Sequence, residues 1–127
     1  MKYIADTDKT MTQAANDLQE AVKASGFGVL HTYDLKATLK SKGIDIPHEC
    51  QIFEICSPKQ AAAVLAEDMS INMALPCRIS VWQQDGKTKI GMIPPKAMLE
   101  SLSNSPVLKK IAEEVEAKMK EMIQAAK

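Results

Sequence analysis

The chain has 127 residues, of which 46% are apolar, and this fits one folded domain with a real core rather than a disordered chain. Its 16 basic and 16 acidic residues give a formal net charge of zero, which argues against nucleic acid as the partner. No apolar run approaches the roughly 18 residues of a membrane span, and charges interrupt the N-terminal stretch MKYIADTDKT, where a signal peptide would be apolar. Three cysteines without a CxxC pair indicate free thiols, so we expect a cytoplasmic protein.

The first half of the chain alternates predicted strands and helices. A short strand over residues 2–5 precedes a helix that begins at a capping box formed by Thr10 and Gln13. This helix carries a single apolar stripe at three- and four-residue spacing, which is typical of a helix that covers a core. The chain then continues with a strand, a short helix and a second strong strand, at residues 27–33, 35–43 and 51–56.

The second half begins with Ser57, which we expect to cap an alanine-rich helix whose first position is Pro58. A loop is predicted over MSINMALP. The next two strands, at residues 78–83 and 88–93, flank Asp-Gly, which favours a tight type I′ hairpin turn. A helical pattern begins again at Lys96 and is interrupted near SNSP.

Helices mixed with at least one antiparallel hairpin predict an α+β fold. We expect an α+β domain over residues 1–104 and an amphipathic helix over residues 105–127 that packs on the domain or on a partner subunit.

Three stretches of the sequence together resemble the 302 family of domains of unknown function. They are KASGFGVLHTYDLKATLKSKGIDIP, IFEICSPKQAAAVL and NMALPCRISVWQQDGKTKIGMI, so the resemblance runs from about residue 10 to residue 95. It implies a two-layer fold of the TATA-binding-protein-like kind, with a sheet of four to five strands covered by helices on one face, often as a dimer. It implies no activity, because the family has none assigned, and it gives no ground for expecting DNA binding, because fold alone does not set function.

Cys56 and Cys77 are the candidate functional thiols. Cys56 precedes a predicted helix start, whose partial positive charge stabilises a thiolate, and Arg78 adds a charge beside Cys77. A thiolate pair, a sulfur carrier or a soft-metal site would need such a setting. The alternative is that both are packing residues, since free cysteine is often buried and Cys77 shares its strand parity with Ile79.

Four other residues are candidates for lining a site. Glu54 lies inside an apolar strand and would need a partner if it is buried. Ser57 and Arg78 stand beside the two cysteines, and His31 alternates with Val29 along a strand. No cofactor is expected, and a metal is the remaining alternative. A zinc site from His31, His48, Cys50 and Cys56 would form only if the fold gathers them, because their spacing matches no zinc motif.

The leading hypothesis is a binding or structural domain without enzymatic activity that forms a homodimer. Trp82, which is opposite in parity to Ile79, and Met119 on the last helix are the expected interface residues. The alternatives are a thiol-dependent sulfur or redox protein that uses Cys56 with Cys77, and a small-ligand or metal-binding module with a pocket between the sheet and the helix after Cys56. A hydrolase or transferase lacks a recognisable pair of nucleophile and base.

Overall fold

The computed structural model describes residues 1–127. Five strands form one fully antiparallel sheet in the order β1-β5-β4-β3-β2. The strands are β1 (Tyr3–Thr7), β2 (Gly28–Asp34), β3 (Cys50–Cys56), β4 (Cys77–Gln84) and β5 (Lys87–Met92). The helices are α1 (Met11–Ala24), α2 (Leu35–Ser41), α3 (Pro58–Glu67), α4 (Pro95–Leu102) and α5 (Pro106–Ala126), with a short 3-10 helix η1 (Met69–Ala74). The predicted α+β class, with a sheet of four to five strands and helices on one face, is confirmed, and the sheet has five strands.

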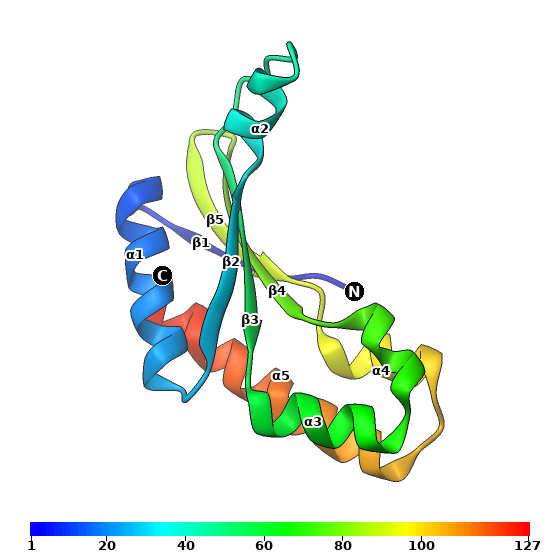
Figure 1. Ribbon diagram of the computed structural model, residues 1–127. Helices are drawn as coiled ribbons and strands as arrows, with labels where there is room; N and C mark the ends of the chain where they lie inside the picture. Colours follow the sequence, from blue (N-terminus) through cyan, green and yellow to red (C-terminus); the bar gives the residue numbers. More distant parts are fainter.

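The two faces of the sheet differ because side chains alternate along each strand. One face, the core face, carries Phe53 and Ile55 of β3, which pair with Ile79 and Cys77 of β4. Phe53, Ile55 and Ile79 are at most 1% exposed and pack beneath α1 and α5. In Figure 1, α1 stands to the left of the sheet, whereas the region to the right of β4 and above α4 is free of helices. The opposite face of the sheet therefore lacks a covering layer over much of its length.

Helix α5 supplies its apolar stripe to this chain's own core. Val115, Met119, Met122 and Ile123 belong to the same buried cluster as Phe53 of the sheet. Met119 is 1% exposed, so its side chain packs inside its own chain and not on the free surface that the expected interface role requires. None of the helices is both long and apolar enough to cross a membrane.

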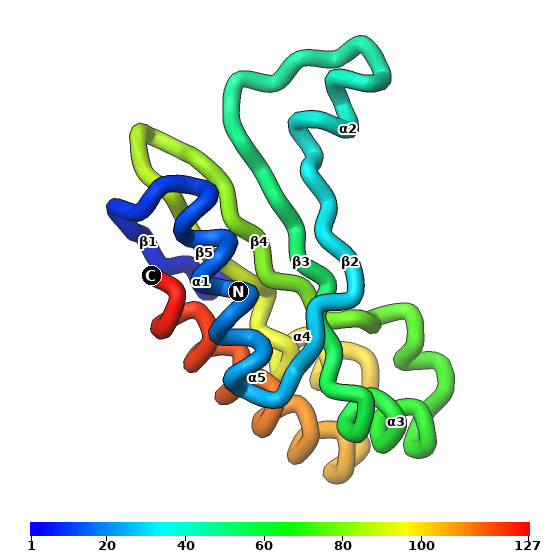
Figure 2. Tube along the Cα trace, turned by 60° about the vertical axis from the view of Figure 1, so that its left-hand side comes forward, coloured from blue at the N-terminus to red at the C-terminus, as the bar shows by residue number.

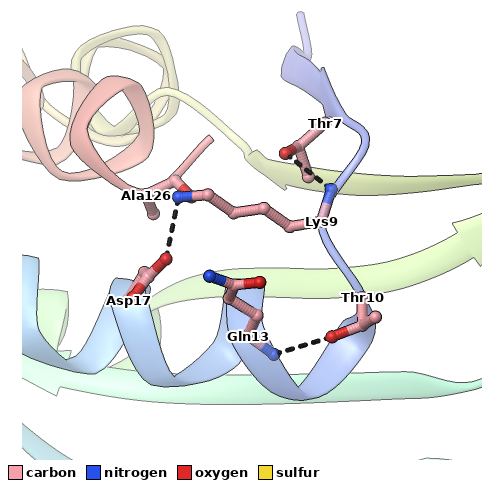
Figure 3. A network of polar contacts seen from close by, with 6 residues as sticks. All are labelled: Thr7, Lys9, Thr10, Gln13, Asp17 and Ala126. Atoms are coloured by element: carbon pink, nitrogen blue, oxygen red, sulfur yellow. Dashed lines mark hydrogen bonds and ion pairs between the residues drawn. The ribbon is translucent and has the colours of Figure 1, made fainter.

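A lysine ties the end of α5 to α1. Lys9 Nζ lies 2.8 Å from Asp17 Oδ2 and donates to the carbonyl oxygen of Ala126 at 2.9 Å (Figure 3). A cation at the C-terminal end of a helix meets carbonyl groups that lack an intrahelical partner, so this contact stabilises the last turn of α5. At the start of α1, Thr10 Oγ1 accepts from the backbone N–H of Gln13 at 3.2 Å, which is the N-cap half of the predicted capping box.

Helices α3, η1 and α4 build a second, smaller cluster with the first half of α5. Its members are Val64, Ile71, Leu99, Leu108 and Ala112. The segment predicted as a loop over residues 69–76 contains η1, because Ile71 is 2% exposed and Asp68 Oδ1 accepts from Ser70 N–H at 2.9 Å. Ser57 stands at the N-cap of α3 as predicted, but its side chain makes no capping hydrogen bond.

The hairpin and the far end of the sheet complete the fold. Asp85 and Gly86 have φ of 54° and 73°, and positive values at both central residues confirm the predicted type of turn between β4 and β5. Figure 2 shows β2 and β3 extending past the other strands as an arm, with α2 at its tip. Strand β2 is the last strand in the sheet order, and most of its residues are exposed.

Candidate functional site

The face of the sheet without helices, called here the open face, is the most distinctive surface of the molecule. It is built from alternate residues of four strands: Ile4, Ile52, Glu54, Arg78, Ser80, Trp82 and Gly91. A groove of about 610 Å³ runs over this face toward η1 and α4. Most of its lining is apolar, and its charged members are Lys2 and Arg78, with no carboxylate among them. A mostly apolar groove with a few polar groups is the usual form of a small-molecule site.

Trp82 forms part of the groove because a glycine makes room for it. A Cβ atom at Gly91 would lie 2.9 Å from Trp82 Cη2 and 3.1 Å from Ile4 Cγ1, so the indole lies against the bare backbone of β5. The indole N–H donates to Gln84 Oε1 at 3.1 Å. Trp82 thus lies outside the core, as its strand parity predicted.

Glu54 is the buried carboxylate of the open face, and it has the partners that burial requires. It is 8% exposed, its Oε1 accepts from the Tyr33 hydroxyl at 2.8 Å, and its Oε2 lies 3.6 Å from Arg78 Nε. The cost of removing a carboxylate from water is offset by these two contacts. The Arg78 side chain remains 64% exposed, so its charge reaches the groove.

Tyr33 and His31 extend this cluster along β2. Their rings stack with centroids 6.0 Å apart, and His31 pairs with Glu54 across the strands. The hydrogen bond that Tyr33 donates to Glu54 raises the pKa of the tyrosine above its usual 10.0, because the bond is lost when the phenol ionises. Of the predicted site-lining residues, the structure thus brings together His31, Glu54 and Arg78.

Cys56 and Cys77 share a second cavity, of about 290 Å³, between the end of β3 and helices α3 and α5. It lies where the sequence predicts a pocket, beside the helix after Cys56, and Ser57 also contributes to its wall. Its lining includes no charged side chain. Cys77 stands opposite Ile55 in the sheet register, one residue from Cys56, and packs against the main core. The structure therefore places both thiols on one apolar wall.

The chemistry of this wall does not favour a thiolate at Cys77. Burial raises the pKa of the Cys77 thiol from 9.0 to about 11, and the neighbouring Cys56 adds to the increase. Arg78 is next in sequence, but it points to the open face and pairs with Glu54. Its expected support for a thiolate is therefore absent.

We predict that iodoacetamide modifies Cys77 much more slowly in the folded protein than in urea at pH 8, with reactivity rising only as the pH approaches 11. Between pH 9 and pH 11 the folded thiol keeps its proton while the unfolded thiol loses it. The free energy of unfolding should therefore fall across this window, and a Cys77→Ala variant should lose that part of the fall. Peptide mass mapping follows the reaction, and rapid modification of folded Cys77 below pH 9 would contradict the prediction.

The residues considered for zinc do not meet. Cys50 and Cys56 stand at opposite ends of β3, and the chain holds no group of three or more His, Cys, Asp or Glu side chains placed to bind a metal ion. Burial, with a smaller contribution from Asp34, also raises the pKa of Cys50. A four-ligand site from His31, His48, Cys50 and Cys56 is therefore not formed.

Sequence reasoning missed Tyr33 and Lys2 and did not foresee the groove. Tyr33 is two residues from His31 on the same strand, so the alternation that singled out His31 also applied to it. Its link to Glu54 depends on the β2–β3 register, which shifts at a bulge between Val29 and His31. Lys2 carries no local signal, because its place in the groove comes from the pairing of β1 with β5.

Comparison with known proteins agrees with this architecture. The family model described as "Domain of unknown function DUF302" matches residues 3–126. A crystal structure of an uncharacterised conserved DUF302 protein from Bacillus stearothermophilus superposes with a TM-score of 0.93 at 34% sequence identity, covering 99% of this chain and 98% of that one. No curated protein matches the chain. The match extends well past residue 95, where the sequence resemblance was expected to end, so α5 is part of the family's domain.

Proposed function

The chain belongs to the DUF302 family, and we propose that it is a binding domain without enzymatic activity that holds a small, largely apolar molecule on its open face. The observation that carries this proposal is the groove of about 610 Å³, with Trp82, Ile52 and Ile4 among its lining residues. Ile4 is 45% exposed, which leaves apolar surface for a ligand to cover. Covering such surface is favourable by about 25 cal/mol per Å².

The groove also fits a binding role better than a catalytic one. Tyr33 donates a hydrogen bond to Glu54, which raises the pKa of the Tyr33 phenol and favours its protonated form, and neither residue lines the groove. No nucleophile paired with a base faces the groove, which is the arrangement that covalent catalysis requires. The three free cysteines support the expectation of a reducing, cytoplasmic setting.

The test uses Trp82, which is the single tryptophan of the chain, as an intrinsic reporter. Titration with decanol, a neutral apolar probe, should give a saturable change in Trp82 fluorescence. An Ile4→Asp variant should weaken decanol binding by about 10-fold, because a carboxylate in the groove loses hydration when the chain of the probe covers it.

Ile44→Asp is the matched control. Ile44 is 55% exposed, lies between α2 and β3, and does not line the groove, so the same change there should leave the decanol affinity unaltered. Absence of a saturable signal in the wild-type protein, or equal losses in the two variants, would refute the binding role of the open face.

A homodimer is the second candidate, and the specific observation in its favour is apolar exposure around the groove. Met73 is 83% exposed, Ile93 is 59% exposed, and both contribute to the groove lining. A second copy could cover them together with Trp82, the expected interface residue. Sedimentation velocity measures the oligomeric state of the wild-type protein and of the Ile4→Asp variant. A wild-type dimer that dissociates in the Ile4→Asp variant supports this candidate. A monomer in both proteins rules it out.

The thiol and metal candidates have weaker support. Cys77 carries a raised pKa, which opposes a sulfur-transfer role that needs a thiolate there. The cavity beside Cys56 remains a candidate for an apolar ligand only, since it offers no charged side chain.

A further inference from the structure

The two cations of the groove lie in one row across the sheet. Ile4 pairs with Gly91, and Gly91 pairs with Ser80, so these three residues form one row across β1, β5 and β4. Strands β1 and β4 are both antiparallel to β5 and hence run in the same direction. Two residues earlier in the chain stand Lys2, directly before β1, and Arg78 on β4, and both line the groove. Ile52, which pairs with Ser80, and Trp82 lie on one side of these cations, and apolar residues of η1 and α4 lie on the other side.

Arg78 is positioned by Glu54, and its other N–H groups remain available as hydrogen-bond donors. Its guanidinium approaches Glu54 through Nε at 3.6 Å, and Glu54 is itself fixed by the Tyr33 hydroxyl at 2.8 Å. A guanidinium has five N–H donors, and no other carboxylate lies within ion-pair distance of Arg78. Lys2 forms no ion pair within the chain. Because Glu54 contacts the guanidinium of Arg78 through Nε, the other N–H donors of Arg78 face away from Glu54.

The groove therefore combines apolar lining with a pair of cations, and no carboxylate belongs to its lining. From this charge complementarity, and resting on the proposed function, we infer that the ligand is an amphiphile whose oxyanion head, a carboxylate or a phosphate, binds Arg78 while its apolar chain lies along Ile52 and Trp82. The planar guanidinium matches both kinds of head with parallel N–H donors. Lys2 adds a second positive charge in the same row. Glu54 and Tyr33 act as positioning residues.

The experiment compares three probes of equal chain length at pH 8: decanol, decanoate and decyl phosphate. We expect decanoate or decyl phosphate to bind about 10-fold more tightly than decanol, the gain typical of a charge-assisted hydrogen bond. Arg78→Gln should remove this preference, so that the anionic probes bind no more tightly than decanol, whereas Arg78→Lys should keep part of it. The stronger of the two anionic probes identifies the head group.

The positioning role has its own readout. Tyr33→Phe removes the hydrogen bond to Glu54 and should lower the preference for the anionic probe over decanol without changing decanol binding. Glu54→Gln should do the same, and Tyr33→Phe keeps the test valid if that variant does not fold. Lys36→Gln, which removes a cation outside the groove lining, is the control and should change nothing.

The outcomes separate the two proposals. If no probe binds, the proposed function fails, and this inference falls with it. If decanol binds as tightly as both anionic probes, or if Arg78→Gln keeps the preference for the anion, the open face is still an apolar site but the oxyanion head is refuted.

Discussion

Replacing Met119 with glutamate should unfold the protein. The Met119 side chain is 1% exposed and belongs to the main core together with Leu18 of α1 and Phe53 of β3. Glutamate at this position would either bury an unpaired carboxylate or take up a proton, and each costs several kcal/mol. A loss of about 4 kcal/mol or more is comparable to the whole stability of a small domain. Urea unfolding followed by circular dichroism measures it.

Val107→Glu is the control for this change, because Val107 is 50% exposed on the same helix. The unfolding midpoint of that variant should stay near the wild-type value. A folded and fully stable Met119→Glu protein would mean that α5 does not pack on its own chain, and it would return Met119 to the role of an interface residue.

Replacing Gly91 with valine should have the second-largest effect. Even a single Cβ atom at this position would meet Trp82 Cη2 at 2.9 Å and the Tyr3 carbonyl oxygen at 3.0 Å. The indole must move, and β1 must shift relative to β5, so we expect a loss of about 1–3 kcal/mol, the usual cost of overpacking. Displacing the indole reshapes the groove, so the fluorescence of Trp82 should change and decanol affinity should fall.

Gly28→Val gives the matched comparison. Gly28 is also a strand glycine, but a Cβ atom there would meet nothing within 4 Å. That variant should keep both the stability and the Trp82 fluorescence of the wild type. Equal effects of the two valines would show that Gly91 matters as a backbone residue and not through the indole that lies on it.

Much of the fold could be predicted because local patterns agree with the tertiary structure. The Asp-Gly turn, the capping box at Thr10 and the alternation along β4 each depend on neighbouring residues alone. The amphipathic pattern of α5 identified its buried stripe but not the surface that covers it. A stripe packs equally well against its own chain or another, so Met119 was assigned to an interface that the structure places inside the core.

The candidate site was less accessible to sequence reasoning, for a related reason. Glu54 was singled out as a carboxylate that needs a partner, but the identity of its partners depends on strand order and register. A bulge between Val29 and His31 shifts the β2–β3 register, and a one-residue shift moves every later side chain to the other face. The bulge has no clear sequence signal here. The cysteines could be singled out from the sequence because a thiol is chemically reactive. The groove, in contrast, is formed by residues that carry no individual functional signal and share the open face.

The most direct test of the central claim is an amide chemical-shift titration of the ¹⁵N-labelled protein with decanoate at pH 8. We predict saturable shifts that are largest at Arg78, Ser80 and Gly91, which belong to the groove. Shifts centred on Ala61, Val64 and Ala112 would place the ligand in the cavity of Cys56 and Cys77 instead. That result, or the absence of any saturable shift, would contradict a binding site on the open face.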